Sequence, residues 1–279
     1  MKKYMFMAVA GMLALSSCSN DENDIQDAKN APRQMTFTAG YNEGGETRAT
    51  LDGATKKVSF DANDEISILS AKNTNTKFTT SAGGASADFT GTATDDSKFY
   101  AVYPYTAGLT LSGDVISGIV IPTSQWNSGW NSGSDFSGWD PKAPIAYATT
   151  EGSSLTFHNA CAILKVTFPD ASFIMGRFTI SANEPLAGTF SLDTSTGTLT
   201  PTSGSTTVTV GNPSDIYNGI NADFNGKTVY VAIAPGTYTG FNLHIYTEYD
   251  DEISKTKSTS VTFEAGKIYD LGSYDLGDL

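Results

Sequence analysis

Apolar and polar residues alternate along short segments of this chain, and no long stretch shows the apolar spacing of an amphipathic helix. Short alternating segments bounded by Gly, Asn, Asp or Pro are typical of half-buried β-strands. Many such strands, with turn residues at close intervals, predict an all-β sandwich protein rather than an alternating βαβ enzyme scaffold. We predict strands in particular over Met35–Ala39, Glu65–Leu69, Lys98–Tyr103, Leu155–His158, Thr206–Val210, Val229–Ala234 and Phe241–Tyr246.

One hairpin can be predicted directly. The segments Phe190–Asp193 and Thr198–Leu199 flank a polar stretch, Asp193–Gly197, which has the composition of a hairpin loop. The loop distantly resembles a calcium-binding loop, but it lacks the second and third acidic ligands and the closing Glu. We therefore interpret it as a turn.

The N-terminus has the features of a secretion signal that ends at a lipid attachment site. Lys2 and Lys3 precede an apolar run over Tyr4–Leu15, and Leu-Ser-Ser-Cys at 15–18 follows. A membrane-spanning helix needs roughly 20 apolar residues, so the run is better interpreted as a removed targeting segment. We predict a signal peptide over 1–17 and a lipid on Cys18, which becomes the mature N-terminus. The alternative is an ordinary signal peptide with Cys18 merely nearby.

Residues 18–33 are predicted to form an acidic tether without aromatic side chains. As a flexible coil, about fifteen residues span roughly 20 Å, enough to lift a first strand away from lipid headgroups. The acidic cluster at 19–24 resembles the signal that sends some Gram-negative lipoproteins to the outer face of the outer membrane, although a solvated linker would look the same. Pro141 and Pro144 suggest a boundary between two domains, which we place at 34–146 and 147–279.

Composition excludes several classes of function. The formal net charge is −13, and it becomes −15 when Lys2 and Lys3 leave with the signal peptide, so the chain has no electrostatic footprint for nucleic acid. Cys161 lies in an apolar run typical of a buried, inert thiol, and two histidines cannot complete a conventional Cys/His zinc site. The familiar hydrolase, metalloprotease, P-loop and dinucleotide motifs are missing from the sequence, so we predict no cofactor and no enzyme activity.

Several dispersed motifs occur in a fixed order along the chain. Besides the Cys18 segment, they are Glu46–Thr50, Phe60 with Asn63–Ile66, Ile121–Gln125, Asp140–Ala148, Leu155–Ala160 and Phe263–Leu271. Together these motifs resemble the fimbrillin family, the lipoprotein-derived subunits of type V pili. They span nearly the whole mature chain, although Phe60 stands where relatives often carry Trp. The resemblance implies two tandem transthyretin-like (Greek-key) β-sandwich domains.

The resemblance also implies assembly with other pilus subunits into a surface fimbria that serves adhesion. In such pilins an Arg-specific protease removes the first strand, and a strand of the neighbouring subunit fills the groove. Cleavage between Arg48 and Ala49 would free the strand that starts at Gln34, whereas cleavage at Arg33 would leave it in place. Alternatively Arg48 is an ordinary loop residue, and the protein is an anchor, tip or other accessory subunit that keeps its strand and its lipid.

A surface lipoprotein that binds glycans is the main competing hypothesis. Trp126, Trp130 and Trp139 lie within fourteen residues of one another, in a stretch rich in Ser, Gly and Asn. Exposed indoles beside amide side chains could stack on the sugar rings of a host or bacterial surface glycan. The simpler interpretation, which we favour, is that these rings pack against one end of the first domain.

Overall fold

The computed structural model describes residues 31–41, 50–51, 58–125, 140, 142–170, 175–211, 224, 226–247 and 252–273. Every regular element in these ranges is a β-strand, which confirms the all-β prediction. Among the described residues there is also no helix with the length and apolar content needed to span a membrane. Six of the seven predicted strands begin and end within one residue of the prediction, and the first is longer by two residues at each end.

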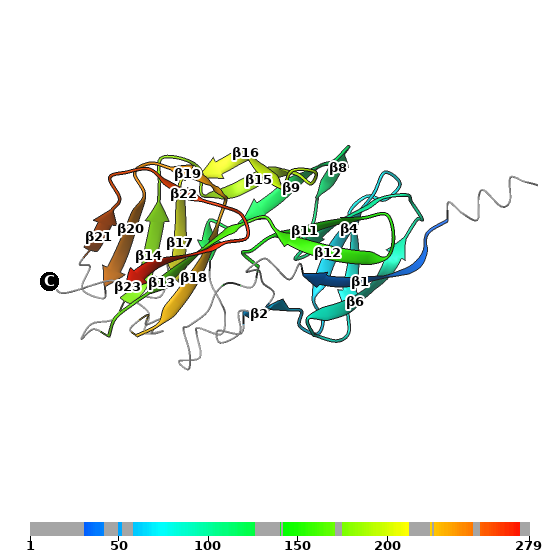
Figure 1. Ribbon diagram of the computed structural model, residues 1–279, viewed down its shortest axis with the longest axis horizontal. Helices are drawn as coiled ribbons and strands as arrows, with labels where there is room; N and C mark the ends of the chain where they lie inside the picture. Colours follow the sequence, from blue (N-terminus) through cyan, green and yellow to red (C-terminus); the bar gives the residue numbers. More distant parts are fainter. Residues whose placement is uncertain are drawn as a thin grey trace, which may run out of the picture.

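Seven strands form a closed barrel, and all neighbouring pairs but one are antiparallel. The barrel lies at one end of the molecule, where β1 is drawn in blue (Figure 1). In order around the barrel the strands are β1 (Arg33–Tyr41), β12 (Ser154–Asn159), β11 (Ala146–Thr150), β7 (Phe99–Tyr103), β4 (Glu65–Leu69), β5 (Thr76–Thr80) and β6 (Ser86–Ala93).

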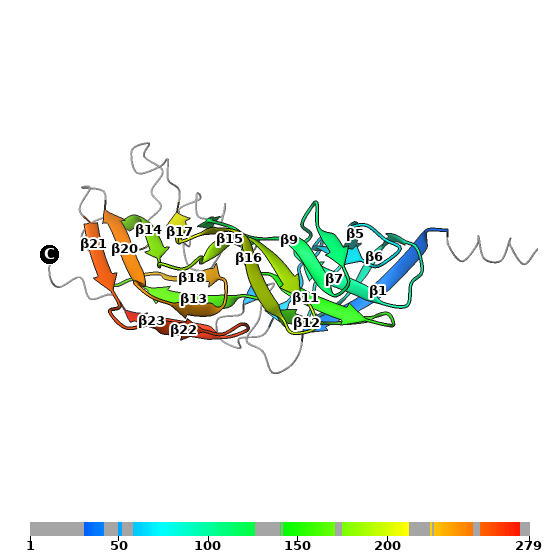
Figure 2. The same cartoon turned by 90° about the horizontal axis from the view of Figure 1, so that it is seen from above.

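The other described strands form four further sheets and the short pair β2 (Thr50–Leu51) and β3 (Val58–Ser59). The five-stranded sheet lies at the end opposite the barrel, and β9, β15 and β16 lie between the two (Figure 2). The sheets are β10 (Ser124–Gln125), β17 (Thr207–Gly211), β14 (Met175–Ser181), β20 (Asn242–Thr247), β21 (Glu252–Thr256); β18 (Thr228–Ile233), β13 (Ala162–Thr167), β23 (Ile268–Ser273); β16 (Thr198–Ser205), β15 (Ala187–Asp193), β9 (Val115–Ile121), β8 (Thr110–Ser112); and β19 (Gly236–Tyr238), β22 (Val261–Phe263).

Strands from the two halves of the sequence share these sheets. The predicted boundary between residues 146 and 147 falls inside β11. Upstream of it, β9 pairs with β15 and β10 pairs with β17, while downstream β12 lies in the barrel between β1 and β11. The division into 34–146 and 147–279 therefore does not separate the sheets, because hydrogen-bonded pairs cross it in both directions.

Two hydrophobic cores meet at β7. Phe99, Ala101 and Tyr103 face the interior of the barrel, whereas Tyr100 and Val102 belong to the core of the remaining sheets. All five residues are buried. A strand buried on both faces has no reason to alternate apolar and polar side chains, which explains its continuous apolar sequence.

At β18 a buried side chain supplies the backbone hydrogen bonds that a neighbouring strand would otherwise make. Gln125 is 1% exposed, its Nε2 donates to the carbonyl of Ala232 at 2.6 Å, and its Oε1 accepts from the Ala232 N–H at 2.9 Å. Nε2 also donates to the carbonyl of Pro122 at 3.2 Å. Buried backbone groups need partners, and here one amide side chain supplies both for Ala232.

Candidate functional site: the first strand of the barrel

The strand β1 closes the barrel. It pairs antiparallel with β6 over eight residue pairs, from Arg33 opposite Ala93 to Gly40 opposite Ser86. On its other side it pairs in parallel with β12 over four residue pairs, from Thr38 to Tyr41. Both edges of β1 are therefore used, and its loss would leave two neighbouring strands with unpaired backbone groups.

Side chains of β1 alternate between the core and the surface. Phe37 and Ala39 are fully buried, whereas Thr36 and Thr38 are exposed. The Phe37 ring lies with its centroid 5.4 Å from that of Phe78 and 5.1 Å from that of Phe99, both in edge-to-face orientation. This alternation agrees with the pattern of apolar and polar residues from which the strand was predicted, and it shows that β1 fills part of the barrel core.

Tyr41 ends the strand inside an aromatic and polar cluster. Its ring stacks on Phe60 with centroids 5.1 Å apart, and it lies 5.8 Å from the ring of Phe157. The hydroxyl of Tyr103 donates to Oδ2 of Asp64 at 3.1 Å. Burial raises the pKa of the Asp64 carboxyl above its usual value, and it raises the pKa of Tyr41 well above the usual value for a phenol.

At the other end, Arg33 forms an ion pair with Asp95, with 2.9 Å between Nη2 and Oδ2. The two side chains are 62% and 52% exposed, so the pair adds little stability. Hydrophobic side chains, rather than charge, hold β1 in the barrel.

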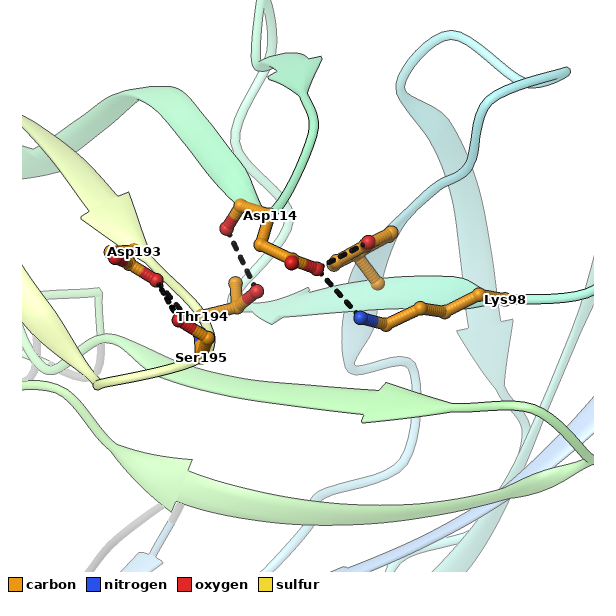
Figure 3. A network of polar contacts seen from close by, with 6 residues as sticks. Lys98, Asp114, Asp193, Thr194 and Ser195 are labelled. Carbon is orange, nitrogen blue, oxygen red and sulfur yellow. Dashed lines mark hydrogen bonds and ion pairs between the residues drawn. The ribbon is translucent and has the colours of Figure 1, made fainter.

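A second polar cluster joins the barrel to the sheet that contains β9 and β15. Oδ1 of Asp114, in the turn between β8 and β9, accepts from Lys98 Nζ at 2.6 Å and from the Tyr100 hydroxyl at 2.7 Å. These two interactions lower the pKa of the Asp114 carboxyl. The carbonyl of Asp114 accepts from the N–H of Thr194 at 2.9 Å and from its hydroxyl at 2.8 Å. Figure 3 shows Asp114 between Lys98 and the turn that carries Thr194.

That turn is the predicted hairpin loop, and β15 and β16 confirm the hairpin. Oδ1 of Asp193 accepts from the N–H of Ser195 at 2.9 Å and from its hydroxyl at 2.6 Å, as expected for an Asp that stabilises a turn. Gly197 has a φ of +74°, and a Cβ there would lie 2.5 Å from the hydroxyl of Tyr147 in β11. Within the described ranges, no three His, Cys, Asp or Glu side chains lie close enough together to hold a metal ion.

The structure describes none of the functional residues predicted from the sequence. Cys18, Arg48, Ala49 and the three tryptophans at 126, 130 and 139 all lie outside the described residues, so their roles stay predictions. Cys161 is described: it is fully buried, and burial raises the pKa of its thiol to about 12. It is an inert thiol at neutral pH.

The strand contributes one core residue that the sequence analysis missed. The predicted strand ended at Ala39, yet Tyr41 continues the same period of two and packs in the barrel core. The alternation Phe37, Ala39, Tyr41 was the available signal. The contacts of Tyr41 with Phe60 and Phe157 carried no signal, because they join parts of the chain that are distant in sequence.

Comparisons with known proteins agree with this architecture. A family model described as fimbrillin-like matches residues 47–272. The crystal structure of a candidate cell adhesion protein from Bacteroides uniformis is 18% identical, with 88% of this chain and 93% of that chain covered and a TM-score of 0.53. At that identity the similarity shows a shared fold only. None of the curated protein sequences searched matches the chain.

Two other solved structures have TM-scores below 0.5, too low to support an argument. A candidate cell adhesion protein from Bacteroides ovatus is 12% identical, with 86% of this chain and 92% of that chain covered and a TM-score of 0.49. The tip fimbrial protein Mfa3 from Porphyromonas gingivalis, with a C-terminal truncation, is 8% identical, with 82% of each chain covered and a TM-score of 0.35.

Proposed function

This chain belongs to the fimbrillin-like family, whose members are not enzymes, and we propose that it is a structural or accessory subunit of a cell-surface fimbria, assembled by strand exchange and serving adhesion. Its partners are then other subunits of the fimbria, and a host or bacterial surface glycan or protein is the target of adhesion. The observation that carries the proposal is the position of β1: the first strand of the barrel lies upstream of Arg48 and fills part of the barrel core.

Removal of β1 would leave a vacancy that another strand can fill. The edges of β6 and β12 would lose their hydrogen-bonding partners, and the surroundings of Phe37 and Ala39 would open to water. Exposed strand edges pair readily with strands of other chains. When each subunit both donates and accepts a strand, the contact is heterologous and the result is an open filament.

We place maturation between Arg48 and Ala49. Arg33 is the other candidate, but it is itself part of β1, where it lies opposite Ala93 and pairs with Asp95. A protease needs an extended, accessible chain, so the sheet protects Arg33. Cleavage after Arg48 also detaches the subunit from Cys18, which we propose carries the lipid that holds the precursor on the outer membrane.

Limited digestion with an Arg-specific protease tests the proposal, with Arg48→Gln and Arg33→Gln as matched variants. We expect the unchanged protein and Arg33→Gln to give a product that starts at Ala49 and forms ladders of oligomers. Arg48→Gln should stay whole and monomeric. A cleaved product that remains monomeric with its strand bound would refute the shaft role and leave an anchored accessory subunit.

A further inference from the structure

Four side chains of β1 pack against the barrel core, those of Met35, Phe37, Ala39 and Tyr41. The last three differ most clearly in their surroundings. Phe37 and Ala39 are fully buried, and Tyr41 is partly buried against the same core. They stand at every second position, so all three point to one side of the strand. The surroundings of each differ, and these differences determine which other strand could fit.

The position of Phe37 is wide and aromatic. Phe89 lies directly opposite on β6, and the rings of Phe78 and Phe99 approach edge-on at 5.4 and 5.1 Å. All three neighbours are buried, with exposures of 2% or less. An aromatic ring fills this position, whereas a small side chain would leave a cavity.

The position of Ala39 is narrow. Its direct neighbours are Ala87 on β6 and Leu155 on β12, and both are buried. Because β1 is paired on both sides there, its backbone cannot shift outward without breaking one of the two ladders. A larger side chain would therefore overpack the core.

The position of Tyr41 suits a flat ring. Tyr41 stacks on Phe60 with 25° between the ring planes and lies beside Phe157, its neighbour on β12. Phe60 itself contacts Phe89 and Tyr103 edge-on. Stacked and edge-to-face contacts of this kind favour an aromatic side chain over an aliphatic one.

The geometry points to a side-chain code for the segment that replaces β1. The replacing segment is an extended stretch of another subunit. It carries an aromatic residue at the position of Phe37, Ala or Gly at the position of Ala39, and a flat ring at the position of Tyr41. It runs antiparallel to β6 and parallel to β12. The inference rests on the proposed strand exchange, and it adds the chemistry by which the groove selects its partner. Outward positions such as Thr36 are exposed and carry no information.

A competition experiment on the full-length chain tests the code without relying on Arg48. The recognition sequence of a site-specific protease is inserted between Gly44 and Gly45, and the protein is cut there. A fluorescent peptide with the sequence of residues 31–43 is then added in excess, and its incorporation is followed by anisotropy and gel filtration. The peptide variants are Phe37→Ala and Ala39→Leu, with Thr36→Ala and Thr36→Leu as matched controls on the exposed side.

We expect the native peptide and both Thr36 variants to exchange with affinities within about twofold of one another. Phe37→Ala should bind about 100-fold or more weakly, as expected for truncation of a buried Phe. Ala39→Leu should bind at least about fivefold more weakly because it overpacks a narrow position. Equal binding of native and Ala39→Leu peptides would overturn the code while strand exchange stands. Failure of every peptide, the native one included, would overturn strand exchange at this groove and the code with it.

Discussion

Replacement of Gln125 by Leu should destabilise the protein through the backbone of a residue far away in sequence. Leu has a similar volume and is apolar, so the buried space stays filled. The N–H and C=O of Ala232, which Gln125 binds at 2.9 and 2.6 Å, lose their partners. Both lie in a region with about 1% exposure, where water cannot replace the lost bonds.

The magnitude follows from those two groups. A buried backbone group without a partner costs about 1–3 kcal/mol, so the free energy of unfolding should fall by about 2–6 kcal/mol. For a chain of this length each kcal/mol lowers Tm by roughly 2–4 °C, so the fall should be at least about 4 °C. Urea unfolding followed by circular dichroism, with thermal scans alongside, measures both quantities.

Gln34→Leu is the matched control, because Gln34 is exposed on β1 and the chemical change is the same. A surface substitution of this kind usually changes stability by less than about 0.5 kcal/mol. An equally small effect of Gln125→Leu would refute the role assigned to the amide. Gln125→Glu provides a second check. The introduced carboxyl group is buried and one of its oxygens faces the Ala232 carbonyl, so the pKa of this carboxyl group is raised in the folded protein. The destabilisation should therefore grow as the pH rises above the usual range for Glu.

Three further predictions concern the lipid anchor at Cys18, the three tryptophans at 126, 130 and 139, and the polar cluster around Asp114. Cys18→Ala should leave an unprocessed or soluble precursor in cell fractionation, and normal processing with membrane retention would contradict the lipid assignment. Single Ala substitutions of Trp126, Trp130 and Trp139 should each lower thermal stability, by about 3–5 kcal/mol if the ring is fully buried; unchanged stability together with lost binding on a glycan array would favour the glycan hypothesis. Asp114→Asn should lower Tm at pH 6, and the difference from the unchanged protein should shrink towards pH 3. The pKa of Asp114 is lowered in the folded state, so its stabilisation is present above the unfolded pKa and is lost as the pH falls through the folded one.

The sequence predicted local structure well because that information is local. The strand β4 has the predicted bounds, since Glu65–Leu69 stands between turn residues. The hairpin of β15 and β16 was predictable because the residues that stabilise its turn lie within five positions: Asp193 accepts a hydrogen bond from the turn backbone, and Gly197 adopts a positive φ. In such places the side chains that define the structure lie next to each other in the sequence.

Pairings between distant segments could not be predicted in the same way. Strand β9 pairs with β15 more than 60 residues later. The alternation of apolar and polar residues in the two strands does not indicate which strand pairs with which. The same holds for Gln125 and Ala232, which are 107 residues apart. A domain boundary drawn at prolines could not take these crossings into account, because composition carries no information on which edges meet.

The parallel pairing of β1 with β12 has a consequence for the order of folding. Thr38 pairs with Ser154, 116 residues later, whereas β4, β5 and β6 are consecutive antiparallel neighbours. Closing a long loop costs chain entropy before any contact compensates for it, and proteins rich in distant pairings fold slowly. We therefore expect the local antiparallel strands to form first and the barrel to close late, when β12 reaches β1. The strand that we propose leaves the subunit during assembly is then among the last to be secured when the chain folds.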